Sequence, residues 1–353
     1  MALEKIGRQV TGSLDWIDLT STIIRLYKAG VLREEGIFAP ELIAAPSGFD
    51  ASPIHAAMLN DRARTASYLA GIAEVVRPGD VVVDIGTGTG ILAMAAARAG
   101  AERVYAIETS SIGKLAQANF EANGLTDRIT LVQGWSTRVS LPERADVLIS
   151  EIIGNEPLAE KVIEVTKDAR SRMLKVNSRI VPKAVKIFGL ALDIPHNKLG
   201  ASVFVNETLL NWRSWYGFNF DAMADAANSA YQVFTIKPQR ARDWNVLSDP
   251  ILLAKIDFQQ FKETLIDTTT MSTATASGEL TGVLVYFELE LSPSVQLSTH
   301  PGRADEGNCW YSLVWVLPKP LDLSEGDRFS VSYKYRKGVE RSGITVTGPY
   351  TPA

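Results

Sequence analysis

Short apolar runs alternate with amphipathic stretches through the first half of the chain. The runs are apolar nearly throughout, which is typical of strands that are covered on both faces. They lie at 81–85, 103–107, 129–133 and 146–150. The amphipathic stretches between them lie at 91–99 and 112–122. Strand–helix–strand units in this order predict a doubly wound parallel sheet.

A longer helix is predicted ahead of this sheet. Ser52 and Pro53 suit the N-cap and the first helical position, so we expect a helix from Pro53 to about Ala73. Before it, residues 17–32 have a helical pattern, and turn-forming residues follow them. We therefore expect residues 1–50 to form an N-terminal segment of helix and loop.

The pattern changes after residue 182, where long β-type runs replace the earlier alternation. Such runs are typical of an antiparallel β domain. They lie at 283–291, 310–317 and 328–335, and the biased stretch 268–280 is expected to be strand plus turn. A tryptophan-rich and then alanine-rich segment, 206–250, interrupts them. We therefore divide the chain into an α/β domain, 51–182, and a β domain, 183–353.

Composition narrows the range of functions. With 353 residues, 46% of them hydrophobic, the chain is long enough to bury the cores of two domains. Its net charge of −4 comes without the clustered lysine and arginine of a nucleic-acid-binding surface, so we expect no nucleic-acid partner.

Cysteine and histidine are scarce. Cys309 is the single cysteine and there are three histidines, so we expect neither an intrachain disulfide nor a metal site. No apolar run reaches membrane-spanning length, and the first residues lack the apolar core of a signal peptide. We therefore expect no membrane partner and a cytoplasmic location.

A glycine-rich loop after the first predicted strand is the strongest local signal. Its glycines are Gly86, Gly88 and Gly90. They connect a strand to a helix, where a backbone must approach a ligand closely. The spacing differs from the dinucleotide pattern G-x-G-x-x-G, whose last glycine would fall at Ile91. Asp84 ends the strand, and Glu108 ends the next strand, where an acid can bind ribose hydroxyls.

Together these residues resemble the class I S-adenosylmethionine (AdoMet) methyltransferases. The resemblance makes Asp84, Glu108 and the three glycines candidate AdoMet-binding residues. A tight turn in another α/β fold is the alternative interpretation, and a nicotinamide enzyme fits less well because of the third glycine. Taken alone, Glu108 fits a solvated strand end equally well.

Three acids follow the strand at 146–150, in the sequence SEIIGNEPLAE, 150–160. Taken together with the glycine loop, this stretch resembles a motif of the protein arginine methyltransferases. In that family, the hairpin after the fourth strand has the spacing S-E-x-x-G-x-x-x-x-x-E. The matching residues are Ser150, Glu151, Gly154 and Glu160. The family's upstream helix, H-x-x-M-L-x-D-x-x-R-T, is matched by His55, Met58, Leu59, Asp61, Arg64 and Thr65.

The resemblance implies an α/β Rossmann-like AdoMet-binding domain, followed by an antiparallel β-barrel domain with a helical dimerisation arm at about 210–248. It implies AdoMet as the cofactor, a homodimer, and an AdoMet-dependent arginine N-methyltransferase that acts on a cationic guanidino substrate. In the family, the arginine of the upstream helix, here Arg64, grips the AdoMet carboxylate. The implied substrate-pocket residues are His55, Met58, Cys309 and Trp310.

Two of the three acids suit this chemistry. A guanidinium has a pKa near 13.8, so it arrives protonated and is a poor nucleophile. Two carboxylates can hold its N–H groups by charge-assisted bonds and so position one nitrogen for methyl transfer. We assign this catalytic role to Glu151 and Glu160. For Glu156 we expect a helix-start residue, stabilised by the helix dipole.

Three departures from the family pattern affect the site. Of the aromatic motif that folds over the cofactor, only Phe49 is kept. No acid follows the third strand to bind the adenine amine, so Ser136 or Thr137 is expected to substitute. The barrel loop that normally reads Thr-His-Trp is Asn-Cys-Trp at 308–310, after a longer loop. His300 either compensates for the missing histidine or is a surface residue.

The sequence leaves the substrate open. Free arginine, a small guanidino metabolite and peptidyl arginine all fit, and the number of methyl groups added is not determined. An AdoMet methyltransferase of this architecture with a different small-molecule nucleophile is a second hypothesis, and a catalytically silent dimeric scaffold is a third. The presence of Glu151 and Glu160 argues against the third, whereas the missing histidine and aromatic lid favour the second or the third.

Overall fold

The computed structural model describes residue 49 and residues 51–224, 230–263, 265–336 and 342–350. These residues all fall in one compact unit, Ser47–Ala353. The helix expected at 17–32 lies outside the described residues, as does all of the 1–50 segment except Phe49. Within the described part of the chain, no helix is long and apolar enough to cross a membrane.

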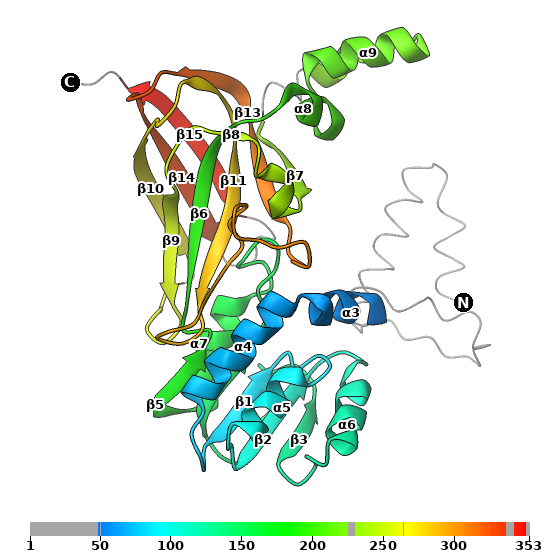
Figure 1. Ribbon diagram of the computed structural model, residues 1–353, viewed down its shortest axis with the longest axis vertical. Coiled ribbons are helices and arrows are strands. Elements are labelled where there is room, and N and C mark those ends of the chain that lie inside the picture. Colours follow the sequence, from blue (N-terminus) through cyan, green and yellow to red (C-terminus); the bar gives the residue numbers. More distant parts are fainter. Residues whose placement is uncertain (1–48, 50, 225–229, 264, 337–341, 351–353) are drawn as a thin grey trace, which may run out of the picture. The chain divides into compact units, whose positions relative to one another are not determined.

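A five-stranded parallel sheet forms the first half of the described chain, in the order β3-β2-β1-β4-β5 (Figure 1). Its strands are β1 (Val81–Ile85), β2 (Arg103–Glu108), β3 (Ile129–Gln133), β4 (Ala145–Ser150) and β5 (Leu174–Val181). The predicted parallel sheet is therefore confirmed. The strand order reverses between β1 and β4, and their carboxyl ends form the switch point where sheets of this kind bind ligands.

Five helices accompany this sheet: α3 (Ser52–Asn60), α4 (Arg62–Val75), α5 (Ile91–Arg98), α6 (Gly113–Ala122) and α7 (Val162–Arg172). The single helix predicted from Pro53 to Ala73 is wrong, because it breaks at Asp61 (φ −72°, ψ 84°). The Asp61 side chain accepts a hydrogen bond from the backbone N–H of Arg64 at 3.0 Å and caps α4. Because a capping aspartate itself leaves the helical conformation, one predicted helix becomes two.

An antiparallel barrel-like domain follows. A larger sheet contains the path β7-β13-β11-β6-β8, with β12 paired to β11 and β9 paired to β6, and a smaller sheet has the order β10-β14-β15. The strands are β6 (Ala184–Asp193), β7 (Gln232–Ile236), β8 (Asn245–Val246), β9 (Ile251–Asp257), β10 (Leu265–Thr273), β11 (Gly278–Glu290), β12 (Gln296–Ser298), β13 (Ser312–Leu323), β14 (Arg328–Arg336) and β15 (Gly343–Tyr350). The three long β-type runs of the sequence correspond to β11, β13 and β14.

Two helices, α8 (His196–Ser202) and α9 (Asn206–Tyr216), lie outside the barrel strands, and α9 projects beyond them (Figure 1). In α8, Leu199 packs with side chains of the larger sheet, such as Leu192. Around α9, large apolar side chains are exposed, namely Leu210, Trp215, Tyr216 and Phe218. The segment expected as the arm, 210–248, also contains β7, β8 and the 3-10 helix η3 (Pro238–Ala241). The helices outside the strands thus begin at His196, before the expected start of the arm at about residue 210.

Candidate active site

The glycine loop passes close to neighbouring side chains. Gly86 has φ +77° and Gly90 has φ +87°, in the left-handed region that favours glycine. A Cβ atom on Gly86 would lie 2.8 Å from Cγ2 of Ile152, and one on Gly90 would overlap the ring of Phe120. The backbone here has room for hydrogen atoms only, as a loop that approaches a ligand closely requires.

Asp84 and Glu108 flank this loop at the ends of β1 and β2. Asp84 is fully buried, and its Oδ2 accepts a hydrogen bond from Oγ1 of Thr87 at 2.6 Å. Burial raises the pKa of Asp84 to about 7. Glu108 is also buried and accepts hydrogen bonds from three backbone N–H groups, including that of Gly88 at 2.9 Å. Glu108 is therefore a buried side chain that is hydrogen-bonded to the glycine loop, and not a solvated strand end.

The pKa of Asp84 gives a prediction about pH. Because the folded state holds this proton more tightly than the unfolded state, the stability that it contributes is present at low pH and is lost as pH rises through about 7. We expect Asp84→Asn to stabilise the cofactor-free protein at about pH 8 and to matter much less near pH 4, where the wild-type carboxyl is protonated as well. Urea unfolding at both pH values measures this, and an equal effect at both would contradict it.

Arg64 lies at the centre of the site. Its guanidinium forms an ion pair with Glu151 and lies 5.3 Å from the centre of the Trp310 ring. It also donates to the carbonyl oxygen of Met58 at 3.3 Å. The break at Asp61 brings Met58, at the end of α3, within reach of Arg64, in the first turn of α4. Arg64, Met58 and Trp310 therefore meet beside Glu151.

Four buried polar atoms around the switch point have no hydrogen-bond partner among the described residues: Nε of Arg64, the hydroxyl of Tyr68, Oδ1 of Asp84 and Oγ of Ser150. Asp84 and Ser150 end the neighbouring strands β1 and β4, and the charges of Arg64 and Asp84 both act on Tyr68. Buried polar groups without partners are rare in folded proteins. This mixture of donors and acceptors fits a ligand that carries an amino group and a carboxylate, such as the methionine end of AdoMet. Tyr68 is not among the residues predicted from the sequence, although it follows Arg64 by one helical turn.

The charge of one guanidinium acts on both acids of the predicted pair. Glu151 contacts Arg64 directly. Burial raises the pKa of Glu160, and the nearby charge of Arg64 partly offsets this. Oε1 of Glu160 lies 3.1 Å from where a Cβ atom on Gly154 would stand, so Gly154 makes room for this carboxylate. Arg64 thus pairs with Glu151 directly and acts on Glu160 through its charge.

The barrel loop at 308–310 closes the site from the other side. The backbone N–H of Cys309 donates to Oδ2 of Asp61 at 2.9 Å, and Nε1 of Trp310 donates to the carbonyl oxygen of Ile153 at 2.7 Å. Asp61 therefore connects the start of α4 to the barrel loop. Burial raises the pKa of the Cys309 thiol to about 11, so it lines the site as a neutral thiol near pH 7.

The other predicted residues lie further from the acid pair or have other partners. His55 is buried, its ring lies against Gly88, and its Nε2 donates to the carbonyl oxygen of Phe49 at 2.8 Å. Ser136 is buried and Thr137 is exposed, both in the turn after β3. His300 packs edge-on against Tyr286, with 4.9 Å between ring centres.

The expectation for Glu156 is wrong. No helix begins there, since α7 starts at Val162, and only 5% of Glu156 is exposed. Its carboxylate accepts hydrogen bonds from the hydroxyl of Tyr333 at 3.1 Å and from Oγ of Ser342 at 2.7 Å. The barrel covers a side chain that the local sequence suggested was solvated.

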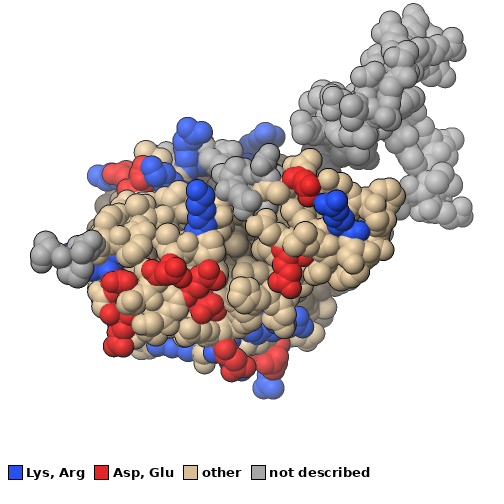
Figure 2. Space-filling view, turned by 90° about the horizontal axis from the view of Figure 1, so that it is seen from above, with Lys and Arg blue, Asp and Glu red and all other residues tan. Residues whose placement is uncertain are grey.

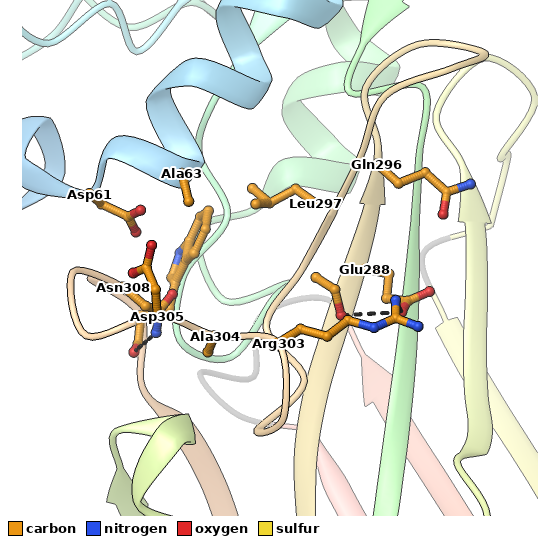
Figure 3. A pocket seen from close by; sticks show the side chains of 11 residues that line it. Asp61, Ala63, Glu288, Gln296, Leu297, Arg303, Ala304, Asp305 and Asn308 are labelled. Carbon is orange, nitrogen blue, oxygen red and sulfur yellow. Dashed lines mark hydrogen bonds and ion pairs between the residues drawn. The ribbon is translucent and has the colours of Figure 1, made fainter. Parts of the chain in front are cut away.

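A cavity of about 240 Å³ lies beside Trp310 (Figure 3). Asp61, Asp305 and Asn308 lie on one side of it, and Arg303, which pairs with Glu288 at 3.2 Å, lies on the other (Figure 3). Asp61 and Trp310 line the cavity and also contact Arg64. The cavity therefore adjoins the site around Arg64. The lengthened loop before Asn308 is visible in the sequence, but the cavity that this loop helps to line is not.

The chain is similar in sequence to known methyltransferases. Residues 62–181 match the family described as ribosomal protein L11 methyltransferase (PrmA), and residues 201–343 match the family described as arginine methyltransferase oligomerization subdomain. Protein arginine N-methyltransferase PRMT10 of Oryza sativa subsp. japonica is 29% identical over 307 residues, which cover 78% of each chain. Probable histone-arginine methyltransferase 1.4 of Arabidopsis thaliana is 32% identical over 290 residues, 77% of this chain and 52% of the relative.

Solved structures share the fold. The Trypanosoma brucei PRMT1 enzyme-prozyme heterotetrameric complex with AdoHcy matches with a TM-score of 0.73 and 23% identity, over 86% of this chain and 96% of that chain. Protein arginine methyltransferase 10 of Arabidopsis thaliana matches with a TM-score of 0.66 and 21% identity, over the same shares. From the glycine loop, the spacing of the acids and these relatives together, the chain belongs to the protein arginine methyltransferase family.

Proposed function

We propose that this protein is an AdoMet-dependent N-methyltransferase that transfers a methyl group to the guanidino group of arginine. The observation that carries the proposal is that Glu151 pairs with a guanidinium whose charge also acts on Glu160, beside the glycine loop at the switch point of the sheet. In the structure that guanidinium belongs to Arg64. A carboxylate that already binds one guanidinium, with a second carboxylate within reach of the same charge, is suited to receive the guanidinium of a substrate.

The candidate cofactor residues fit AdoMet, which when bound supplies a methyl group on a positively charged sulfur. Arg64 would hold its carboxylate, because a planar guanidinium matches a carboxylate. Glu108 would bind the ribose hydroxyls, and the backbone of 86–90 would allow close approach. Asp84 would act beside the amino group. Ser136 and Thr137 are the residues proposed for the adenine amine.

The two acids would act by position and charge. Each carboxylate accepts N–H groups of the substrate guanidinium, which draws the positive charge toward the nitrogens that are held. The remaining terminal nitrogen then faces the methyl donor, and this fixed approach lowers the barrier by several kcal/mol, on the order of a hundredfold or more in rate. Glu151 and Glu160 would also stabilise the positive charge that develops on the methylated nitrogen until that nitrogen loses one proton to water, with AdoHcy as the other product. Met58, His55, Cys309 and Trp310 are proposed to shape the pocket.

Peptidyl arginine is the substrate that we favour over free arginine or a small guanidino metabolite. The support comes from the relatives, whose names describe protein and histone arginine methylation. A nucleic-acid partner is not part of the proposal, since basic and acidic side chains are interspersed among the coloured residues of the face in Figure 2. A cytoplasmic location and the division into domains at 51–182 and 183–353 remain parts of the proposal, which cell fractionation and limited proteolysis test.

Transfer of labelled methyl groups tests the function. The protein is incubated with labelled AdoMet and, separately, with free arginine, an arginine-containing peptide and a protein mixture. We expect label in methylarginine from the peptide or the protein mixture, and none with Glu151→Gln. Label in another product would support a different nucleophile. Binding of AdoMet without any transfer would favour the silent scaffold instead.

A homodimer formed through α8 and α9 is a further part of the proposal. Leu210, Trp215 and Phe218 are each more than half exposed, and an apolar patch of this kind marks an interaction site. We expect a dimer by light scattering at micromolar concentration and a monomer after Leu210→Asp. Leu265→Asp, at an exposed leucine on β10, serves as the control and should leave the dimer intact. A monomeric wild-type protein would contradict the proposal.

A further inference from the structure

The segment that carries the two proposed catalytic acids is held by the barrel at several points. We define it as the acid hairpin, residues 151–160. The barrel loop binds its first part, through Trp310 to the carbonyl oxygen of Ile153 and through the backbone N–H of Tyr311 to Oδ1 of Asn155 at 2.8 Å. Strand β14 binds its second part, through the hydroxyl of Tyr335 to the carbonyl oxygen of Leu158 at 3.1 Å.

Glu156 lies between these hydrogen-bonded residues and accepts two further hydrogen bonds from the barrel. Oε1 accepts from Tyr333, which is itself fully buried, and Oε2 accepts from Ser342. A buried carboxylate is costly unless hydrogen bonds satisfy it, so its donors hold it in one place. Burial and then the charge of Glu156 raise the pKa of Tyr333 well above its ordinary value, which keeps the phenol protonated and donating.

The backbone of Glu156 is also packed next to the second acid. At Gly154 a Cβ atom would lie 3.1 Å from the carbonyl oxygen of Glu156 and 3.1 Å from Oε1 of Glu160. The backbone at Glu156 and the carboxylate of Glu160 therefore both press against Gly154. A shift of the chain at Glu156 would change the space in which the Glu160 carboxylate sits.

We propose that Glu156 is a positioning residue, which fixes the acid hairpin to β14 and to Ser342 so that Glu160 faces the substrate guanidinium. Both of its oxygens bind barrel hydroxyls, so it acts through the backbone and not on the substrate. Catalytic groups must be held within roughly 0.5 Å of their working geometry, and residues behind them provide this support. The inference rests on the proposed function, because it assigns a role within the same site.

Four variants test it: Glu156→Leu, Glu156→Gln, Tyr333→Phe and the control Tyr350→Phe. Tyr350→Phe removes a hydroxyl pair with Ser330 in the same sheet, without contact to the acid hairpin. We expect Glu156→Leu to lower kcat about a hundredfold, since misplacement by about 1 Å costs that much. Tyr333→Phe should lower kcat about tenfold, because one of the two hydroxyl bonds remains. Glu156→Gln should stay within about threefold of wild type, because hydroxyls can donate to its oxygen and accept from its amide.

Each variant is measured as kcat and KM on an arginine peptide, the dissociation constant of AdoHcy by calorimetry, and the folded fraction. We expect the AdoHcy constant to stay within about threefold of wild type, because the hydroxyl groups that bind Glu156 belong to Tyr333 and Ser342 in the barrel domain. A purely structural role would lower stability in Glu156→Leu and Tyr350→Phe alike and leave kcat per folded molecule unchanged. That result would overturn the role inferred for Glu156 and leave the proposed function untouched.

Two further outcomes are decisive. If Glu156→Leu does not fold, Tyr333→Phe carries the test, and a kcat within about threefold of wild type overturns the inference. If wild type itself transfers no methyl group, the proposed function fails and the inference fails with it. Loss of kcat in Glu156→Leu with recovery in Glu156→Gln supports the inference, because it separates hydrogen bonding from mere occupancy of the position.

Discussion

Glu160→Gln is expected to lower kcat about 10²- to 10³-fold, the effect of removing one electrostatic partner from a transition state. The amide keeps the size of the side chain and one acceptor oxygen, but it loses the negative charge that would stabilise the methylated guanidinium. Because Glu160 makes its proposed contacts to the substrate, the affinity for AdoHcy should change little. Peptide kinetics and calorimetry with AdoHcy measure the two effects separately.

The pH dependence of this variant adds an independent readout. Burial raises the pKa of Glu160, so the carboxylate of the free enzyme is protonated at a higher pH than an ordinary glutamate. The wild-type kcat/KM should therefore fall as pH drops through this raised pKa, and Glu160→Gln should lack that acid limb. Glu121→Gln, at an exposed glutamate on α6, is the control. Wild-type rates in Glu160→Gln would remove this residue from the mechanism.

The sequence predicts the α/β half well for a physical reason. Strands such as β1 are buried along their whole length, so every position is apolar or functional and the run is visible without its neighbours. The break at Asp61 escaped prediction because the apolar pattern continues across it. What decides the break is a hydrogen bond to Arg64 and a second one to the barrel loop at Cys309. The second partner lies 248 residues away in the chain.

The site divides in the same way. Glu151, Glu160 and the glycine loop have a fixed spacing that a resemblance can detect, and in the structure the charge of Arg64 acts on both acids. Glu156 has no such spacing, and its partners Tyr333 and Ser342 lie 177 and 186 residues further along. A local rule about helix starts was the best available guide, and burial by a distant strand overrode it. Buried polar contacts between segments far apart in the sequence cannot be predicted from the local pattern of apolar and polar residues.

Gly90→Ala is expected to destabilise the protein by about 2–5 kcal/mol, since backbone strain and steric overlap add at this position. The comparison with Gly326→Ala explains why, because both glycines have a left-handed backbone, with φ +87° and φ +94°. An alanine in that conformation costs about 1–2 kcal/mol at either position. At Gly326 nothing lies within 4 Å of the added carbon, whereas at Gly90 it would overlap the buried ring of Phe120. Overpacking of this kind adds about 1–3 kcal/mol.

Urea unfolding of the two variants separates backbone strain from steric overlap. The double variant Gly90→Ala, Phe120→Leu removes part of the overlap but loses ring packing in the core, so it should recover only part of the difference. Gly90→Ala should also weaken AdoHcy binding much more than Gly326→Ala, because Gly90 is the N-cap of α5 and lies in the loop proposed to hold the cofactor. Equal destabilisation of both single variants would mean that the Phe120 ring moves aside freely. In that case the close packing of Phe120 under the glycine loop would not be what fixes the loop's shape.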